Sequence, residues 1–359
     1  MAKRAIVVTA GGEVFCGEAF GASTTVIGEL AFDTGVVGYQ EVLTDPYYND
    51  KALVMTFPLA GCCGVTGEDD QSESGHPRAL IVREFARRPS NFRSVMSLSE
   101  LLEEREITGV YGVDTREMTH YIRKHGSCRA LITSEDMSPE EARALLAKSE
   151  TQSDEVARAS CDRRWYSRTA SHSNTIAVLD CGVKQSLINA LGSFGCNVTV
   201  MPHDTSAAEI LACAPDGLVI SNGPGDPKKA VSALETVKAL KGKLPMFGTG
   251  LGLLLIALAC GADTAKLPFG MHGGCPARDA VSGRIFSASC ALSYAPVAST
   301  LTSAGLVQTY SSIPGGLVFG VQSESQRLYG VLFDSEGAPG SRDACALLCS
   351  FVNSLQGRA

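Results

Sequence analysis

The chain has 359 residues, a length that predicts two domains, and its 45% hydrophobic and 19% charged residues are typical of a globular protein. A formal net charge of −7 excludes the basic field that attracts nucleic acid or an anionic membrane surface. No apolar run reaches about 18 residues, the length of a membrane span, and the first residues do not form a signal peptide. We therefore expect a cytoplasmic protein with neither nucleic acid nor membrane as a partner.

The first half of the chain begins with predicted strands. Residues 5–33 alternate strand-like runs with glycine-rich turns, and helical patterns follow at 98–105 and 115–124. These patterns predict a β-rich α+β domain over residues 1–148. The next stretch, residues 149–174, is polar, serine-rich and aperiodic, so we expect it to be a linker between two domains.

The second domain, residues 175–359, is predicted to belong to the α/β class. Four predicted strands are each followed by a predicted helix, at 175–180, 184–195, 196–202, 206–214, 216–222, 230–240, 244–248 and 251–262. This order is typical of right-handed βαβ units in a mainly parallel sheet. Beyond residue 266 we expect short strands and loops, followed by a last helix at 342–355.

Two glycine-rich turns follow predicted strands, at positions where open α/β sheets bind ligands. In residues 222–227 the backbone N–H groups of Gly223 and Gly225 would suit a carboxylate or an oxyanion; the alternative is a rigid loop between a strand and a helix. Residues 244–260 have the strand, tight turn and helix of an elbow that presents a catalytic nucleophile. Gly250 occupies the apex of this elbow, and glycine has no side chain to present.

Few other side chains offer catalytic chemistry. Thr249 has a hydroxyl but no predicted base beside it, and all six histidines lie at or before residue 272. We expect His272 to be a solvated loop residue, and Asp334 and Glu336 to lie on a loop that faces water. The thirteen cysteines include no CxxC pair, so we expect buried free thiols and no metal site.

Besides the elbow, four segments of the sequence are typical of one known family: residues 38–46 (GYQEVLTDP), 90–93 (SNFR), 114–116 (DTR) and 221–227 (SNGPGDP). Through them the chain resembles, over nearly its whole length, the small subunit of carbamoyl-phosphate synthetase, a class I glutamine amidotransferase. The resemblance implies an N-terminal domain that docks on a large subunit and a C-terminal amidotransferase domain with a flavodoxin-like fold. In the family, ammonia from glutamine passes to the large subunit, which uses ATP and magnesium. We expect no cofactor in this chain.

The resemblance also implies a catalytic triad of cysteine, histidine and glutamate. The cysteine attacks the glutamine amide, the histidine moves the proton and the glutamate orients the histidine. In this sequence the three positions are occupied by Gly250, Asp334 and Glu336. Only the glutamate is kept, so no intact set of catalytic residues is expected and glutamine hydrolysis is predicted to be absent.

The positions that resemble the family's glutamine pocket are also changed in part. Those that match the family pattern are Gly223, Gly225, Leu251 and Tyr294, and those that depart from it are Tyr47, Leu254, Ala291 and Ser293. Apolar replacements would leave polar groups of glutamine without partners, at about 1 to 3 kcal/mol for each buried group. Glutamine is therefore a doubtful ligand for this chain.

Three hypotheses for the function stay open from the sequence. The first is a docking or regulatory subunit for ammonia-dependent synthesis of carbamoyl phosphate, on a large subunit that serves arginine or pyrimidine biosynthesis. The second is a glutaminase that uses another nucleophile, with Cys275 or Cys290 as candidates. The third is a binding module without enzymatic activity, in which the altered pocket holds a different ligand.

Overall fold

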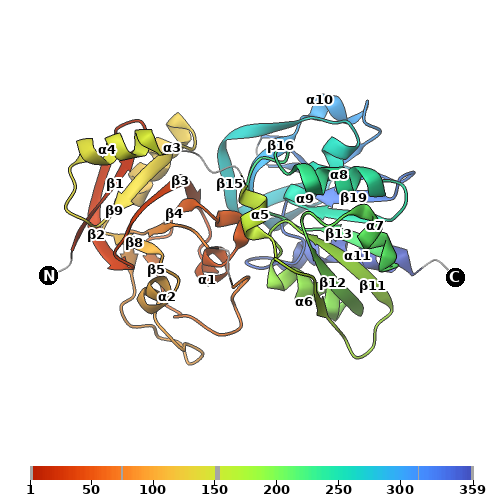
Figure 1. The fold of residues 1–359 in the computed structure, drawn as a ribbon, viewed down its shortest axis with the longest axis horizontal. Coiled ribbons are helices and arrows are strands. Elements are labelled where there is room, and N and C mark those ends of the chain that lie inside the picture. Colours follow the sequence, from red (N-terminus) through yellow and green to blue (C-terminus); the bar gives the residue numbers. More distant parts are fainter. Residues whose placement is uncertain (1–2, 74–75, 150–153, 314, 357–359) are drawn as a thin grey trace. The chain divides into compact units, whose positions relative to one another are not determined.

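A computed structural model describes residues 3–73, 76–149, 154–313 and 315–356 (Figure 1). The chain forms two compact units, of which the first contains Met1–Gln152 and Pro268–His272 and the second contains Ser153–Leu267 and Gly273–Ala359. The first unit thus includes one short segment from far along the chain, which no sequence pattern indicated.

The first unit is built on a closed barrel with the strand order β1-β2-β8-β6-β4-β3-β9. Its strands are β1 (Arg4–Thr9), β2 (Val14–Gly21), β3 (Thr25–Asp33), β4 (Lys51–Met55), β6 (Ala79–Ile81), β8 (Thr108–Tyr111) and β9 (Arg129–Thr133). Two short strands, β5 (Leu59–Ala60) and β7 (Glu84–Phe85), pair separately. Side chains alternate between two cores: Ala5 and Val7 lie in the larger cluster, and Ile6 and Val8 pack against Leu146 in the smaller one. A β-rich first domain is therefore confirmed.

Most helices of the first unit begin at a residue whose side chain caps them, and α1 is the exception. They are α1 (Tyr39–Leu43), the 3₁₀ helix η1 (Pro46–Tyr48), α2 (Leu98–Glu104), α3 (Thr115–His125) and α4 (Pro139–Lys148). Ser97 and Glu100 form a capping box at the start of α2. The Asp114 carboxylate accepts a hydrogen bond from the Glu117 amide at the start of α3, which ends at Gly126 with a φ of 86°. The two helices predicted in this half are confirmed.

The second unit is built on a ten-stranded sheet with the order β10-β12-β11-β13-β14-β19-β18-β17-β15-β16. Its strands are β10 (Trp165–Ser167), β11 (Asn174–Asp180), β12 (Cys196–Pro202), β13 (Gly217–Ile220), β14 (Met246–Thr249), β15 (Thr264–Asp279), β16 (Ile285–Pro296), β17 (Val307–Ser312), β18 (Val318–Ser323) and β19 (Leu328–Val331). Neighbouring strands from β12 to β19 are parallel, and β10, β17 and β18 pair antiparallel. The predicted α/β class and mainly parallel sheet are confirmed.

Helices cover both faces of this sheet (Figure 1). They are α5 (Glu155–Ala159), α6 (Gln185–Ser193), α7 (Ala207–Ala212), α8 (Val231–Leu240), α9 (Leu251–Ala259), α10 (Ala298–Leu301), the 3₁₀ helix η2 (Arg342–Ala344) and α11 (Cys345–Leu355). The chain steps from β11 to β12 in one direction and from β12 to β13 and β14 in the other. Right-handed crossovers therefore put α6 on the face opposite α7, α8 and α9. The helix contacts agree with this placement, because α6 contacts α11 whereas α8 contacts both α7 and α9.

Two details of the chain differ from the sequence-based expectations. The expected linker, residues 149–174, contains α5 and β10 in its described part, and Trp165 of β10 pairs with Val200 of β12; residues 150–153 lie outside the described residues. Short strands were expected beyond residue 266, but β15 and β16 are the longest strands described. Glycine and proline residues within β15 interrupt the alternation by which a strand is recognised in a sequence.

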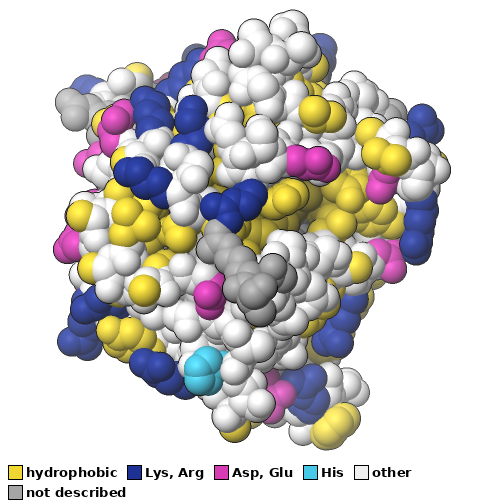
Figure 2. Space-filling view, turned by 90° about the vertical axis from the view of Figure 1, so that its right-hand side faces the viewer, with side chains coloured by type: hydrophobic (Ala, Val, Ile, Leu, Met, Phe, Trp, Pro, Cys, Tyr) yellow, Lys and Arg dark blue, Asp and Glu magenta, His cyan; other side chains and the backbone are white. Residues whose placement is uncertain are grey.

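The surface in Figure 2 carries acidic and basic side chains interspersed with hydrophobic ones. No large area of that face has a single sign of charge. Across the described residues, every helix is too short or too polar to pass through a bilayer.

The packing of α9 on the sheet generates a stability prediction. A Cβ atom on Gly252 would lie 2.2 Å from the Ile220 carbonyl oxygen, whereas a Cβ on Gly192 in α6 would meet nothing within 4 Å. We expect Gly252→Ala to lower the free energy of unfolding by about 1 to 3 kcal/mol through overpacking. Gly192→Ala is expected to raise it by up to about 1 kcal/mol. Urea unfolding followed by Trp165 fluorescence measures both, and equal effects of the two substitutions would contradict the prediction.

Candidate functional site

The turn between β14 and α9 has the backbone of a nucleophile elbow. Gly250 has φ 54° and ψ −114°, and its amide donates a hydrogen bond of 2.8 Å to the Val331 carbonyl oxygen. The glycines on either side allow close packing: a Cβ on Gly248 would lie 2.4 Å from the backbone of Gly252. The elbow is therefore shaped by backbone contacts, and its apex carries no side chain.

The Asn222 side chain occupies the space next to this apex. A Cβ on Gly250 would lie 2.0 Å from the Asn222 Oδ1 atom. The same oxygen accepts a hydrogen bond of 3.0 Å from the Leu251 amide, and Asn222 Nδ2 donates one of 3.3 Å to the Ala291 carbonyl oxygen. In elbow enzymes the amide after the nucleophile helps to stabilise the oxyanion. Here that amide has an internal acceptor.

The loop with Gly223 and Gly225 is tied to the segment after β11. The Cys181 amide donates to Ser221 Oγ at 2.9 Å, and a Cβ on Gly223 would lie 2.0 Å from the Cys181 carbonyl oxygen. Gly225 adopts a φ of 89° and is partly exposed. Both glycines are thus required by the backbone path of the loop, which supports the rigid-loop alternative.

Asp334 and Glu336 are buried beside the ammonium group of Lys184, so the expectation that they face water was wrong. Lys184 Nζ lies 3.0 Å from Asp334 Oδ1 and 2.7 Å from Glu336 Oε1, and it donates a third hydrogen bond of 3.0 Å to the Ala338 carbonyl oxygen. The three charged side chains are 2%, 5% and 1% exposed. The three N–H donors of the ammonium group match these three acceptors. A buried cation at this position makes burial of two carboxylates possible.

Lys184 is a residue that the sequence analysis missed. It follows β11, Asn222 follows β13, Gly250 follows β14 and Asp334 follows β19. All four therefore lie at the carboxyl ends of parallel strands, and the strand order reverses direction between β11 and β13. The position of Lys184 just after a predicted strand was a signal that could have identified it.

The other residues of the expected pocket fall into two groups. In the second unit, Leu254 and Ala291 are buried, whereas Ser293 and Tyr294 of β16 are partly exposed. The Ala291 carbonyl contacts Asn222, so the structure brings this strand to the elbow. Tyr47 belongs to the first unit.

Tyr47 and His272 form a buried pair in the first unit, so the expectation of a solvated loop histidine was wrong. His272 Nδ1 lies 3.0 Å from the Phe32 carbonyl oxygen, and Nε2 lies 3.1 Å from the Tyr47 hydroxyl. A carbonyl oxygen only accepts, so Nδ1 carries the hydrogen and Nε2 accepts from Tyr47. Burial, with a smaller contribution from the Lys51 charge, lowers the pKa of His272 to about 3. This histidine is a neutral structural residue.

The alternative nucleophiles are enclosed. Cys275 and Cys290 are 2% and 3% exposed, and Thr249 is buried with its hydroxyl donating to the Phe333 carbonyl oxygen at 3.2 Å. Among the residues that the structure describes, no group of three or more His, Cys, Asp or Glu side chains is placed to hold a metal ion.

The ion cluster around Lys184 generates a second prediction. Lys184→Met would leave two carboxylates without their cation, so we expect the free energy of unfolding of the second unit to fall by about 3 to 5 kcal/mol. The triple variant Lys184→Met, Asp334→Asn, Glu336→Gln is expected to recover most of this loss. Urea unfolding followed by Trp165 fluorescence gives both values, and an undiminished loss in the triple variant would show that charge is not the cause.

The pKa of His272 predicts a pH dependence of stability. The folded-state pKa of about 3 lies below the ordinary value of 6.5, so the unfolded chain binds the proton first. The contribution of neutral His272 to the free energy of unfolding is complete above pH 6.5 and is lost as the pH falls toward 3. At about pH 5 we expect a loss of about 2 kcal/mol in the first unit. Hydrogen exchange of the β3 amides, corrected for intrinsic rates, measures it, and His272→Gln should show a smaller change between neutral pH and pH 5.

Comparison with known proteins agrees with this arrangement of units. The CPSase domain of the carbamoyl-phosphate synthase small chain matches residues 7–132, and the class I glutamine amidotransferase family matches residues 177–350. A carbamoyl phosphate synthase small chain of Listeria monocytogenes is 37% identical over 100% of this chain and 98% of its own length. The Oceanobacillus iheyensis protein of that name is 36% identical over 99% and 97%.

A third relative carries a narrower name. The carbamoyl phosphate synthase pyrimidine-specific small chain of Lactiplantibacillus plantarum is 37% identical over 95% of this chain and 93% of its own length. These similarities extend through both units. The chain therefore belongs to the carbamoyl phosphate synthase small chain family and contains a class I glutamine amidotransferase domain.

Proposed function

We propose that this chain is a carbamoyl phosphate synthase small subunit that does not hydrolyse glutamine. It binds a large subunit, which uses ATP and magnesium, and supports or regulates the synthesis of carbamoyl phosphate from free ammonia. The observation that carries the proposal is the position of the Asn222 amide, whose Oδ1 atom lies where a side chain on residue 250 would begin.

The first argument concerns the attack on the glutamine amide. Covalent hydrolysis needs a nucleophile and a set of donors for the oxyanion. Gly250 offers no nucleophile, and the Leu251 amide is bonded to Asn222. The elbow therefore supplies neither a nucleophile nor a free oxyanion donor to a bound glutamine. Occupation of the space by Asn222 also hinders the entry of an external nucleophile such as water.

The second argument concerns proton transfer. Within the family pattern, Asp334 stands at the position of the histidine that moves the proton. Its carboxylate forms a buried ion pair of 3.0 Å with Lys184, which also binds Glu336. The ammonium group of Lys184 therefore contacts both carboxylates. We infer that the cluster stabilises the fold and takes no part in general base catalysis.

The third argument concerns the partner. The relatives are named as small chains, and the family model for the first domain matches residues 7–132 of this chain. The first unit keeps a complete barrel and its buried core. We infer that this unit docks on a large subunit, and that docking has been retained while the chemistry of the second unit has been lost.

The direct test is a paired assay with the large subunit from the same source. Both chains are co-expressed and purified, and carbamoyl phosphate formation is measured with ammonium chloride and with glutamine. We expect a stable complex that is active with ammonium chloride and inactive with glutamine. Failure of the chains to copurify would contradict the docking role. Glutamate release at an enzymatic rate would contradict the loss of hydrolysis, and its disappearance in Cys275→Ser or Cys290→Ser would identify the alternative nucleophile.

A variant of the elbow separates the missing nucleophile from the rest of the altered site. We expect Gly250→Cys to lack glutaminase activity, because Asn222 occupies the adjacent space and Asp334 is not a histidine. We also expect a loss of about 1 to 3 kcal/mol in unfolding free energy from the positive φ and the contact with Asn222. Gly242→Ala is the matched control, since residue 242 has a positive φ in open space. Glutamine hydrolysis by Gly250→Cys alone would show that only the nucleophile has been lost.

A further inference from the structure

Four parallel strands of the barrel in the first unit end at the same level. The register pairs Asp33 of β3 with Met55 of β4, and Ile81 of β6 pairs with Val54 of β4 and with Val110 of β8. Their carboxyl ends therefore form one edge. In sheets with parallel strands, ligands bind at this edge, because the chain leaves each strand there through a loop.

The residues that follow these four strands line a pocket of about 710 Å³. Thr34 follows β3, Thr56 follows β4, Arg83 follows β6 and Asp114 follows β8. Backbone hydrogen bonds hold the segments together: the Thr56 amide donates to the Asp33 carbonyl, and the Gly112 amide donates to the Arg83 carbonyl, each at 3.0 Å.

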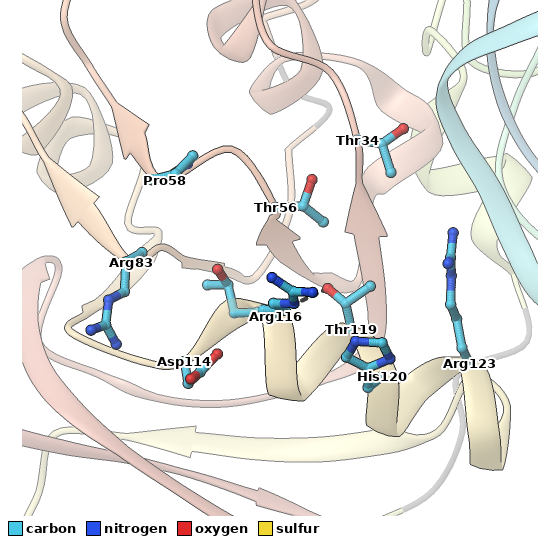
Figure 3. A pocket seen from close by; sticks show the side chains of 10 residues that line it. Thr34, Thr56, Pro58, Arg83, Asp114, Arg116, Thr119, His120 and Arg123 are labelled. Atoms are coloured by element: carbon cyan, nitrogen blue, oxygen red, sulfur yellow. Dashed lines mark hydrogen bonds between the residues drawn. The ribbon is translucent and has the colours of Figure 1, made fainter.

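Helix α3 supplies the other wall of this pocket. Arg116, Thr119, His120 and Arg123 lie at helical spacings of three and four, so they share one face. Figure 3 shows that Arg116 and Arg123 project from α3 toward the side on which Thr34 and Thr56 lie. The pocket thus combines side chains from the strand ends with a row of polar side chains from one helix.

The charge of the pocket is its distinctive property. Arg83, Arg116 and Arg123 are exposed, and in the described parts of the chain none of their guanidinium groups has a hydrogen-bond acceptor or a carboxylate partner. The Arg123 guanidinium only lies over the Phe32 ring, at 5.6 Å. By contrast, Arg105 of the same unit pairs with a carboxylate at 2.9 Å. Three guanidinium groups without a carboxylate partner among the described residues therefore line one pocket.

Three other polar side chains of the pocket already have internal partners. The Asp114 carboxylate caps α3 by accepting from the Glu117 amide. The hydroxyls of Thr34 and Thr119 donate to the carbonyl oxygens of His272 and Thr115. The guanidinium groups of Arg116 and Arg123 are open to a ligand, with His120 on the same helix and Arg83 at the other end of the pocket (Figure 3). A ligand that satisfies them must present several anionic oxygens.

We propose that this pocket binds a small phosphorylated molecule that carries at least two negative charges. Guanidinium groups present forked N–H donors that match the oxygens of phosphate, and they keep their charge at all physiological pH values. The hollow at the strand ends suits a compact ligand enclosed between the strands and α3. The proposal does not depend on the loss of glutamine hydrolysis, because every residue in it belongs to the first unit.

The test is calorimetric titration of the full chain with pyrophosphate at low ionic strength. We expect one saturable site, with inorganic phosphate binding more weakly because it has fewer charges. Arg116→Gln and Arg123→Gln should each weaken binding about tenfold or more, since each removes a charge-assisted contact. Lys124→Gln is the matched control, because it removes one exposed charge from the same helix without lining the pocket. It should change the affinity less than about threefold.

Three outcomes would overturn the proposal. One is the absence of saturable pyrophosphate binding at millimolar concentrations, in a protein whose unfolding transition is intact. Another is equal weakening by Lys124→Gln and the two arginine variants, which would show general attraction of anions. The third is loss of copurification with the large subunit in the arginine variants without pyrophosphate binding in the wild type, which would assign the pocket to a protein contact instead.

Discussion

The hydrogen bond between the Leu251 amide and Asn222 Oδ1 requires the absence of a side chain at residue 250. A Cβ atom there would lie 2.0 Å from the same oxygen, so the glycine and the inserted amide depend on each other. The backbone of the elbow does not depend on a nucleophile, because Gly248 and Gly252 allow it to pack closely against neighbouring backbone. The shape of a catalytic turn is therefore compatible with a glycine at its apex.

A second internal interaction is the buried ion cluster around Lys184. Removing a carboxylate from water is costly unless a cation and further hydrogen bonds compensate it. Lys184 compensates two carboxylates and is itself fully bonded by Asp334, Glu336 and the Ala338 carbonyl. Such a cluster is well suited to holding together the ends of β11 and β19.

Both units place polar side chains at the carboxyl ends of parallel strands, but in the described parts of the chain these side chains are bonded to one another only in the second unit. In each, polar side chains follow parallel strands and lie at the carboxyl edge, because the chain leaves every parallel strand at that edge. In the second unit these side chains bond to one another. In the first unit Arg83 at this edge, and Arg116 and Arg123 of the adjacent helix α3, have no carboxylate partner among the described residues. This difference favours a ligand site at the barrel over one at the amidotransferase elbow.

By itself the sequence determined the α/β class of the second half, the β-rich start, the helix caps and the vacant apex at Gly250, since these depend on local periodicity or on a single residue. It also showed the resemblance on which the family assignment was first based. Only the tertiary structure decided that Lys184 neutralises Asp334 and Glu336, that His272 is buried against Tyr47, and that Arg83 lies beside α3. Those neighbours come from distant parts of the chain, and the order and register of strands, which no local pattern encodes, bring them together.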